Sequence, residues 1–137
     1  MGYLLTKIAR AVATRFAERI APLGIRPGHF GVLSMVAATP SGSQLELGRM
    51  LGVAPSALVA LIDELEARGA VQRTVDAADR RRSAIAITDS GRDLLTAAME
   101  AGAKVDDELL AGIPPSDRAV LHRLLATVAD HAGVLPG

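Results

Sequence analysis

The sequence predicts a mainly α-helical fold with one small β-hairpin. Half of the 137 residues are hydrophobic but only 2% are aromatic, so the core consists of Leu, Val, Ile and Ala, which favours packing of helices on helices. Apolar residues recur at helical spacing over most of the chain, whereas one short region alternates like a pair of strands. The length fits a single domain, residues 1–137, with its own hydrophobic core.

The first two helices are predicted from apolar periodicity and its interruptions. An apolar stripe repeats at every fourth position over residues 4–20, as an amphipathic helix requires. A stretch containing Gly and Pro, residues 24–28, separates it from a short second helix over residues 30–37, which Thr39 and Pro40 close.

Local end signals place a third and a fourth helix close together. Ser43 and Glu46 form the Ser-x-x-Glu pattern in which each side chain bonds the other's backbone N–H, so a helix should begin at Ser43 and end near Gly52. Pro55 suits the first turn of the next helix, and Gly69 ends it. The core-facing positions of that helix are predicted to be Leu58, Leu61, Ile62 and Leu65. About three residues therefore join the two helices.

A hairpin and two more helices are predicted in the rest of the chain. Residues 71–75 and 84–87 alternate like two strands around a polar turn, residues 76–82. Thr88 can cap a long helix, and Ser116 can cap the last one.

The charges are unevenly distributed although the net charge is zero. Residues 1–43 hold five basic residues and one acidic residue, and residues 93–137 hold three basic and seven acidic residues. A neutral balance is weak evidence against a nucleic-acid-binding protein, because such domains are usually basic.

Composition and spacing exclude or disfavour several kinds of function. Without cysteine the chain has no disulfide, no thiolate nucleophile and no cysteine-ligated zinc. His29, His122 and His131 are too widely spaced for a metal site, and no set of nucleophile, base and acid occurs, so we expect no enzyme, no cofactor and no metal. Neither a signal peptide nor an apolar run near ~20 residues is present, so we expect a cytoplasmic protein without a membrane partner.

Residues 47–65 have the pattern of a helix-turn-helix: a helix, a tight glycine turn and a second helix with its core positions in phase. In DNA-binding proteins the second helix of this unit enters the major groove, although an ordinary helical hairpin has the same local pattern. The hairpin tip contains Asp79, Arg80, Arg81 and Arg82. Alone this tip would be a solvated turn, but directly after a recognition helix it becomes a wing whose arginines reach phosphates and the narrow minor groove.

In these segments the sequence resembles the MarR-type (multiple-antibiotic-resistance regulator) transcriptional regulators. The resemblance covers nearly the whole chain and is most specific over residues 44–92, including Leu-Glu-Ala-Arg-Gly-Ala-Val-Gln-Arg and, after it, Asp-Ala-Ala-Asp-Arg-Arg-Arg. It implies a winged helix-turn-helix fold with a DNA-binding lobe at about residues 28–87. It also implies N- and C-terminal dimerisation helices at about residues 3–22 and 88–132.

The resemblance implies a role for individual residues at the DNA. Gln44 would touch a phosphate, and Arg73 would contact the DNA backbone at the base of the wing. Asp79 would pair with Arg81 to brace the wing. The residues of the recognition helix that face the major groove would be Ser56, Ala57 and Ala60. The residue that enters the minor groove would be Arg80, Arg81 or Arg82.

The chain departs from the family pattern in its recognition helix. Val59, Ala60 and Glu64 stand where many members have arginine or another polar residue, so few donors remain for direct base readout. Specificity would then depend more on methyl contacts, DNA shape and the wing, where Arg82 replaces a small residue and adds a charge.

Two functions stay open on this sequence. The first is a ligand-responsive repressor that acts as a homodimer on a palindromic operator in double-stranded DNA, with a small apolar or aromatic acid as its effector. Candidate residues lining the effector site are Arg15, Phe16, His29 and Phe30. The alternative is a winged-helix protein-interaction module with weak or no DNA binding, which the acidic Asp63, Glu64 and Glu66 favour.

Overall fold

A computed structural model describes residues 1–40, 42–75, 78–79 and 83–134 of the chain. In order, the elements are α1 (Gly2–Ile20), the short 3-10 helix η1 (Ala21–Leu23), α2 (Pro27–Ala38), α3 (Gln44–Leu51), α4 (Pro55–Ala67), β1 (Val71–Val75), β2 (Ser83–Ile87), α5 (Asp89–Leu109) and α6 (Pro115–His131). The predicted mainly helical fold with one hairpin is confirmed.

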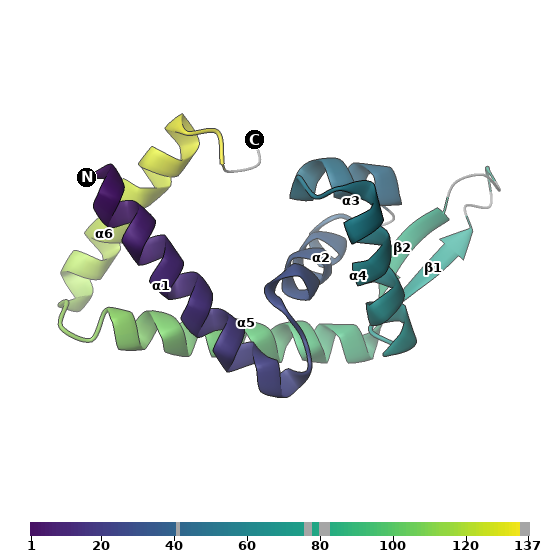
Figure 1. Ribbon diagram of the computed structural model, residues 1–137, viewed down its shortest axis with the longest axis horizontal. Helices are drawn as coiled ribbons and strands as arrows, with labels where there is room; N and C mark the ends of the chain where they lie inside the picture. The colour runs from purple at the N-terminus through teal and green to yellow at the C-terminus, as the bar shows by residue number, and fades with distance from the viewer. Residues whose placement is uncertain (41, 76–77, 80–82, 135–137) are drawn as a thin grey trace.

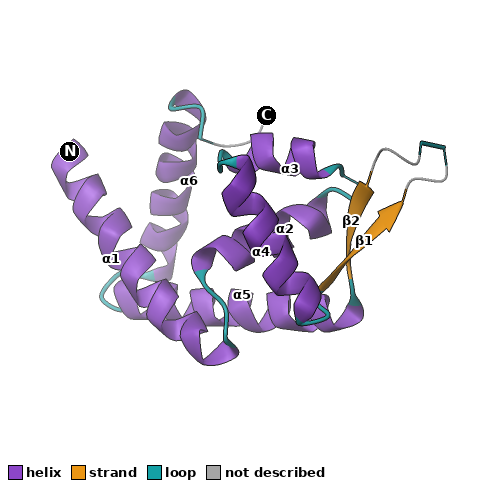
Figure 2. Ribbon diagram, turned by 45° about the vertical axis from the view of Figure 1, so that its right-hand side comes forward, coloured by secondary structure: helices purple, strands orange, loops and turns teal. Residues whose placement is uncertain are grey.

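The long helix α5 connects two parts of the molecule (Figure 1). The helices α2, α3 and α4 and the hairpin form a compact lobe at the N-terminal half of α5, while α1 crosses α5 and α6 turns back at its far end (Figures 1 and 2). The start of α1 and helix α6 lie together at the C-terminal end of α5, and we call this part the α1–α6 end. It lies at the opposite end of α5 from the lobe (Figure 1).

The core of the lobe brings together side chains from all of its elements. It consists of Val32, Leu33, Val36, Leu47, Leu58, Ile62, Leu65, Ala70, Val71 and Ile85. All are aliphatic, which fits the low aromatic content, and their burial supplies the main free energy that holds the helix-turn-helix in place.

The hairpin pairs β1 and β2 antiparallel, with Val71 opposite Ile87 and Val75 opposite Ser83. It is attached to the start of α3 by an isolated bridge between Ser43 and Ala84. Because of this bridge, the wing strands and the helix-turn-helix form one unit.

Two of the predicted helix caps are confirmed. The Glu46 N–H donates to Ser43 Oγ at 3.2 Å, and the Ser43 N–H donates to Glu46 Oε2 at 2.8 Å, so α3 begins with a complete capping box. At the start of α5 the Gly91 N–H donates to Thr88 Oγ1 at 3.0 Å.

The prediction that Ser116 caps the last helix is wrong. Helix α6 begins two residues earlier than a Ser116 cap requires, with Pro114 at the cap position and Pro115 as the first helical residue. Pro115 has its φ fixed near the helical value and has no N–H to satisfy, so it starts the helix without a side-chain cap.

No single helix within the described ranges is long and apolar enough to cross a membrane. The helices α3 and α4 together pass the same test of length and composition, but they are bent by 114° at the turn between them.

Candidate nucleic-acid interface

Helices α3 and α4 form a helix-turn-helix. Their axes are bent by 114° across a three-residue connection, residues 52–54, within the range typical of this motif. Gly52 has φ 62°, a left-handed conformation that glycine adopts without strain. The structure thus supports the helix-turn-helix interpretation of this segment.

Helix α4 has the predicted helical phase. Leu58, Ile62 and Leu65 are buried, whereas all three residues predicted to face the major groove are exposed. Those three are Ser56, Ala57 and Ala60. Their side chains are small, so a duplex lying against α4 can approach its backbone closely.

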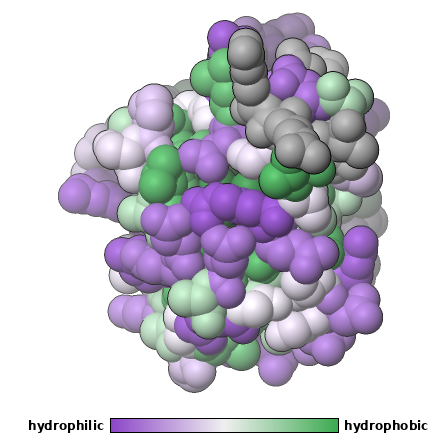
Figure 3. All heavy atoms as spheres, turned by 90° about the vertical axis from the view of Figure 1, so that its right-hand side faces the viewer, coloured by the Kyte–Doolittle hydropathy of each residue, from purple (hydrophilic) through white to green (hydrophobic). Residues whose placement is uncertain are grey.

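The acidic side chains of α4 are matched by basic partners. Arg73 on β1 pairs with both Asp63 and Glu66, and Arg26 pairs with Glu64 at 2.8 Å. The hydrogen bond to Asp63, followed by the bond to Glu66, raises the pKa of Arg73 above its ordinary value. The surface seen from the hairpin end carries a band of hydrophilic side chains across its middle (Figure 3). Internal ion pairs therefore offset the negative charge of α4.

His29 contacts the same carboxylate oxygen of Glu64 as Arg26 does. The residue is only 3% exposed, its Nδ1 accepts a hydrogen bond from the Arg26 N–H at 3.0 Å, and its Nε2 lies 2.7 Å from Glu64 Oε2. Since Nδ1 is an acceptor, Nε2 carries the hydrogen and donates it to Glu64. This bond is the main reason that the pKa of Glu64 is lowered.

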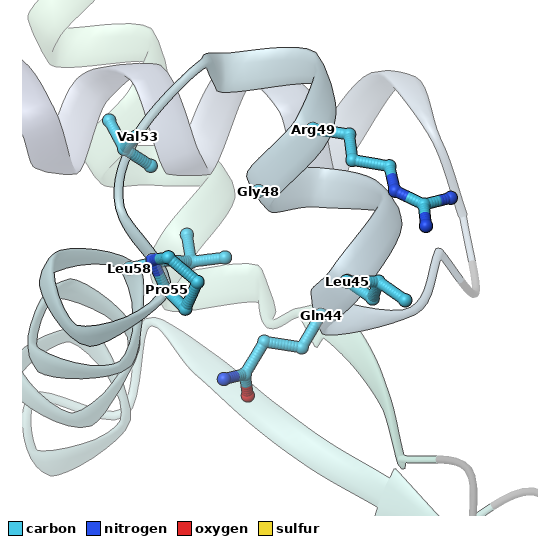
Figure 4. A pocket seen from close by; sticks show the side chains of 7 residues that line it. All are labelled: Gln44, Leu45, Gly48, Arg49, Val53, Pro55 and Leu58. Carbon is cyan, nitrogen blue, oxygen red and sulfur yellow. The ribbon is translucent and has the colours of Figure 1, made fainter.

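A hollow of about 410 Å³ lies between α3 and the start of α4 (Figure 4). Its lining residues are Gln44, Leu45, Gly48, Arg49, Val53, Pro55 and Leu58. Gln44, the predicted phosphate contact, is half-buried at the first position of α3, and in Figure 4 its side chain points away from that of Arg49. Apolar side chains thus form the hollow, with two polar ones extending from it.

The remaining predicted DNA residues lie at the hairpin. Arg73 is half-buried in the middle of β1, and Asp79 is exposed. Arg80, Arg81 and Arg82, and with them the predicted Asp79–Arg81 pair, lie outside the described residues.

Comparison with known proteins identifies the family. A model of the MarR family matches residues 23–82. A transcriptional regulator of that family from Rhodococcus sp. RHA1 is 31% identical, with 93% of this chain and 91% of that chain covered and a TM-score of 0.79. The chain belongs to the MarR family.

Two other similar proteins are described as transcriptional regulators. The transcriptional repressor CouR was solved on a 23-mer DNA duplex; it is 34% identical, with 94% of this chain and 92% of that chain covered and a TM-score of 0.81. CouR from Rhodococcus jostii was also solved with p-coumaroyl-CoA. A putative transcriptional regulatory protein for the hcr operon of Thauera aromatica is 29% identical over 126 residues, which is 91% of this chain and 76% of that protein.

Membership of the MarR family settles the class of function. Its members are DNA-binding transcription factors without enzymatic activity, so the prediction of a regulator rather than an enzyme is confirmed. In the described part of the chain, no group of three or more His, Asp or Glu side chains could hold a metal ion.

A second hollow, of about 370 Å³, lies where α1, α2 and α5 meet. Phe16 and Phe30, two of the four residues suggested for an effector site, line it and contact each other edge to face at 5.0 Å between ring centroids. The other two do not: His29 points to α4, and Arg15 lines a separate, more polar hollow of about 350 Å³ beside Glu108.

Sequence reasoning missed two features of this MarR-family site. It treated His29 as a lining candidate and did not connect it with Glu64, which is 35 positions away and follows no local pattern. It also passed over Arg49, although one signal was visible: Arg49 is the single Lys or Arg in residues 44–67.

Proposed function

We propose that this MarR-family chain is a ligand-responsive repressor that binds a palindromic operator as a homodimer. The observation that carries the proposal is the exposed row Ser56, Ala57 and Ala60 on the second helix of a helix-turn-helix. Such a row meets base edges when the helix lies in the major groove. The similar repressor CouR, solved on a DNA duplex, supports a repressor that binds double-stranded DNA.

The α1–α6 end supports a homodimer. Helix α6 has no buried residue, and α1 buries only Ile20 against its own chain. Large apolar side chains are exposed on both helices: Tyr3, Leu4, Ile8, Val120, Leu124, Leu125 and Val128. Apolar patches of this kind mark interfaces, and a second copy with the same patches covers them by two-fold symmetry. A two-fold dimer in turn requires a palindromic site.

We assign the DNA contacts as follows. The lobe at about residues 28–87 binds DNA and the flanking helices dimerise, within one domain. Gln44 contacts a phosphate, and Arg80, Arg81 and Arg82 supply most of the electrostatic affinity from the wing, braced by Asp79. Arg73 is paired with Asp63 and Glu66. Its guanidinium must therefore bind a DNA phosphate in addition to these two carboxylates, or leave one of them.

We assign the effector to the hollow between α1, α2 and α5. Val12, Phe16 and Phe30 give it apolar and aromatic walls, which fit the apolar or aromatic part of a small acid. CouR, which was solved with p-coumaroyl-CoA, supports an aromatic acyl group as one form of such a ligand. Because the target is chromosomal DNA, we place the protein in the cytoplasm.

The test is binding of the purified protein to the DNA upstream of its gene and to an unrelated duplex, at several salt concentrations. We expect tighter binding to the upstream DNA, and affinity that falls with salt because counterions leave the neutralised phosphates. Neutralising Arg80, Arg81 and Arg82 together should flatten the salt dependence by up to ~0.9 for each phosphate that the wing no longer neutralises. No binding at low salt would overturn the proposal and favour a protein-interaction module.

The dimer has its own test. We expect the mass of a dimer in solution at micromolar concentration, and Leu124→Glu should shift it toward the monomer because a charge in the apolar patch disfavours pairing. A monomeric wild type would contradict the dimer.

A further inference from the structure

The helix-turn-helix has one cation, and it is not on the recognition helix. Arg49, in the last turn of α3, is the single Lys or Arg in residues 44–67, and α4 has none. Affinity for duplex DNA depends largely on cations that neutralise phosphates. Any direct charge contact from the helix-turn-helix itself therefore falls on Arg49.

Arg49 is available for such a contact, unlike the other arginines beside α4. Within the described ranges its exposed guanidinium has no hydrogen bond or ion pair. Arg26 is paired with Glu64 and Arg73 with Asp63 and Glu66, while Arg68 donates to the carbonyl oxygens of Leu23 and Gly24. The guanidinium of Arg49 also extends away from α4 in Figure 4.

The position of Arg49 connects it to the predicted contacts. It lines the same hollow as Gln44 and as Pro55, the residue directly before the groove-facing Ser56. At the hollow, α3 and α4 pack closely, because a Cβ added to Gly48 would lie 3.2 Å from Leu58 Cδ2. Apolar walls beside a guanidinium and an amide match a sugar–phosphate strand, whose deoxyribose carbons and phosphate oxygens need both kinds of surface.

We propose that Arg49 is a DNA-backbone contact, which binds a phosphate flanking the base pairs that face α4. It supplies from α3 the positive charge that the recognition helix lacks. The assignment rests on the proposed DNA binding. A phosphate contact fixes position and carries no sequence information, so Arg49 strengthens binding to all duplexes alike.

The experiment measures the affinity of wild type and of Arg49→Gln for the upstream DNA and for an unrelated duplex over a range of salt concentrations. For Arg49→Gln we expect the slope of log affinity against log salt to fall by roughly 0.9 for each phosphate left without its cation, with a similar loss of affinity on both duplexes. Arg49→Lys should keep most of the slope, because a phosphate accepts a point charge. The matched control is Arg92→Gln, which removes one charge from an exposed position near the start of α5, away from the apolar patch on α1 and α6 and from the hollow that Arg49 lines.

The outcomes separate the two proposals. If wild type shows no salt-dependent binding, the proposed function itself fails. If wild type binds DNA but Arg49→Gln keeps its slope, or Arg92→Gln loses as much, only the Arg49 assignment is overturned. Thermal unfolding of each variant checks the fold. If Arg49→Gln unfolds early, the assignment is judged on Arg49→Ala in place of Gln, and an unchanged slope there overturns it.

Discussion

His29 Nε2 donates a hydrogen bond of 2.7 Å to Glu64 Oε2 and thereby ties the first turn of α2 to the recognition helix. The other ring nitrogen accepts from the Arg26 N–H, so both polar atoms of this buried ring are satisfied. Next to it, Leu61 of α4 packs against the same turn of α2, because a Cβ added to Gly28 would lie 3.1 Å from Leu61 Cδ2. One polar and one apolar contact therefore fix α4 relative to α2.

The first prediction removes the polar contact. His29→Leu loses both hydrogen bonds and leaves the Arg26 N–H without its acceptor, so we expect a loss of about 1–3 kcal/mol in the free energy of unfolding. Urea denaturation at one fixed protein concentration measures it, because the proposed dimer would make the stability depend on concentration.

A double-mutant cycle is the control for this prediction. If the bond between His29 and Glu64 is the cause, His29→Leu and Glu64→Ala together should cost less than the sum of the two single losses. Additive losses would show that the bond to Glu64 adds no stability and that His29 acts through the Arg26 N–H and its packing.

The second prediction concerns acid pH. The hydrogen bond from His29 lowers the pKa of Glu64 below its ordinary value of 4.5, so the folded state binds this proton less readily than the unfolded state. The resulting stabilisation is complete above pH 4.5 and is lost as the pH falls through the lowered folded pKa. The difference in unfolding free energy between wild type and Glu64→Gln should therefore shrink below pH 4.5 and not before. A difference that grows as the pH falls would contradict it.

The third prediction tests the contact between the hairpin and α5. A Cβ at Gly91 would lie 2.0 Å from the Ala70 carbonyl oxygen, so Gly91→Ala must push the start of α5 away from the backbone before β1. We expect a loss of about 3 kcal/mol, at the upper end for overpacking. The control is Gly102→Ala in the same helix, where the nearest atom is 3.6 Å away. There alanine should stabilise the helix by about 0.5–1 kcal/mol. Equal effects at both sites would refute the clash.

Local signals explain how much of the fold could be predicted. The capping box at Ser43, the glycine turn at Gly52 and the buried phase of α4 depend on residues within a few positions of each other, and all three are confirmed. The prediction of a cap at Ser116 was wrong because Pro115 is itself a suitable first residue of the helix. Proline has no N–H that a cap would have to satisfy.

The partners of the recognition helix could not be predicted in the same way. Glu64 meets His29 across 35 positions, and Asp63 meets Arg73 across 10, so both pairs depend on how α2 and β1 pack against α4. The sequence alone presented these acids as an argument against DNA binding, whereas the structure shows them engaged with basic partners.

The last prediction tests the groove-facing side of α4. Ala60 is exposed and Leu61 packs against the core, although the two are adjacent in sequence. If Ala60 faces the major groove, Ala60→Arg should tighten DNA binding, since a good bidentate contact to guanine is worth roughly 1–3 kcal/mol of discrimination. Its unfolding free energy should change by no more than about 0.5 kcal/mol, because arginine is a good helix former at an exposed site.

Leu61→Arg is the matched comparison, because it places the same side chain one position along the helix. Its guanidinium would displace the packing against Gly28 and the core, so we expect a loss of about 2–4 kcal/mol, read by urea denaturation, with DNA affinity falling as the fold is lost. If Ala60→Arg is as destabilising as Leu61→Arg, the side chain at position 60 is buried in the folded protein. If it is stable but leaves affinity for every duplex unchanged, the exposed side of α4 does not meet DNA, and the assignment of Ser56, Ala57 and Ala60 to the major groove has to be given up.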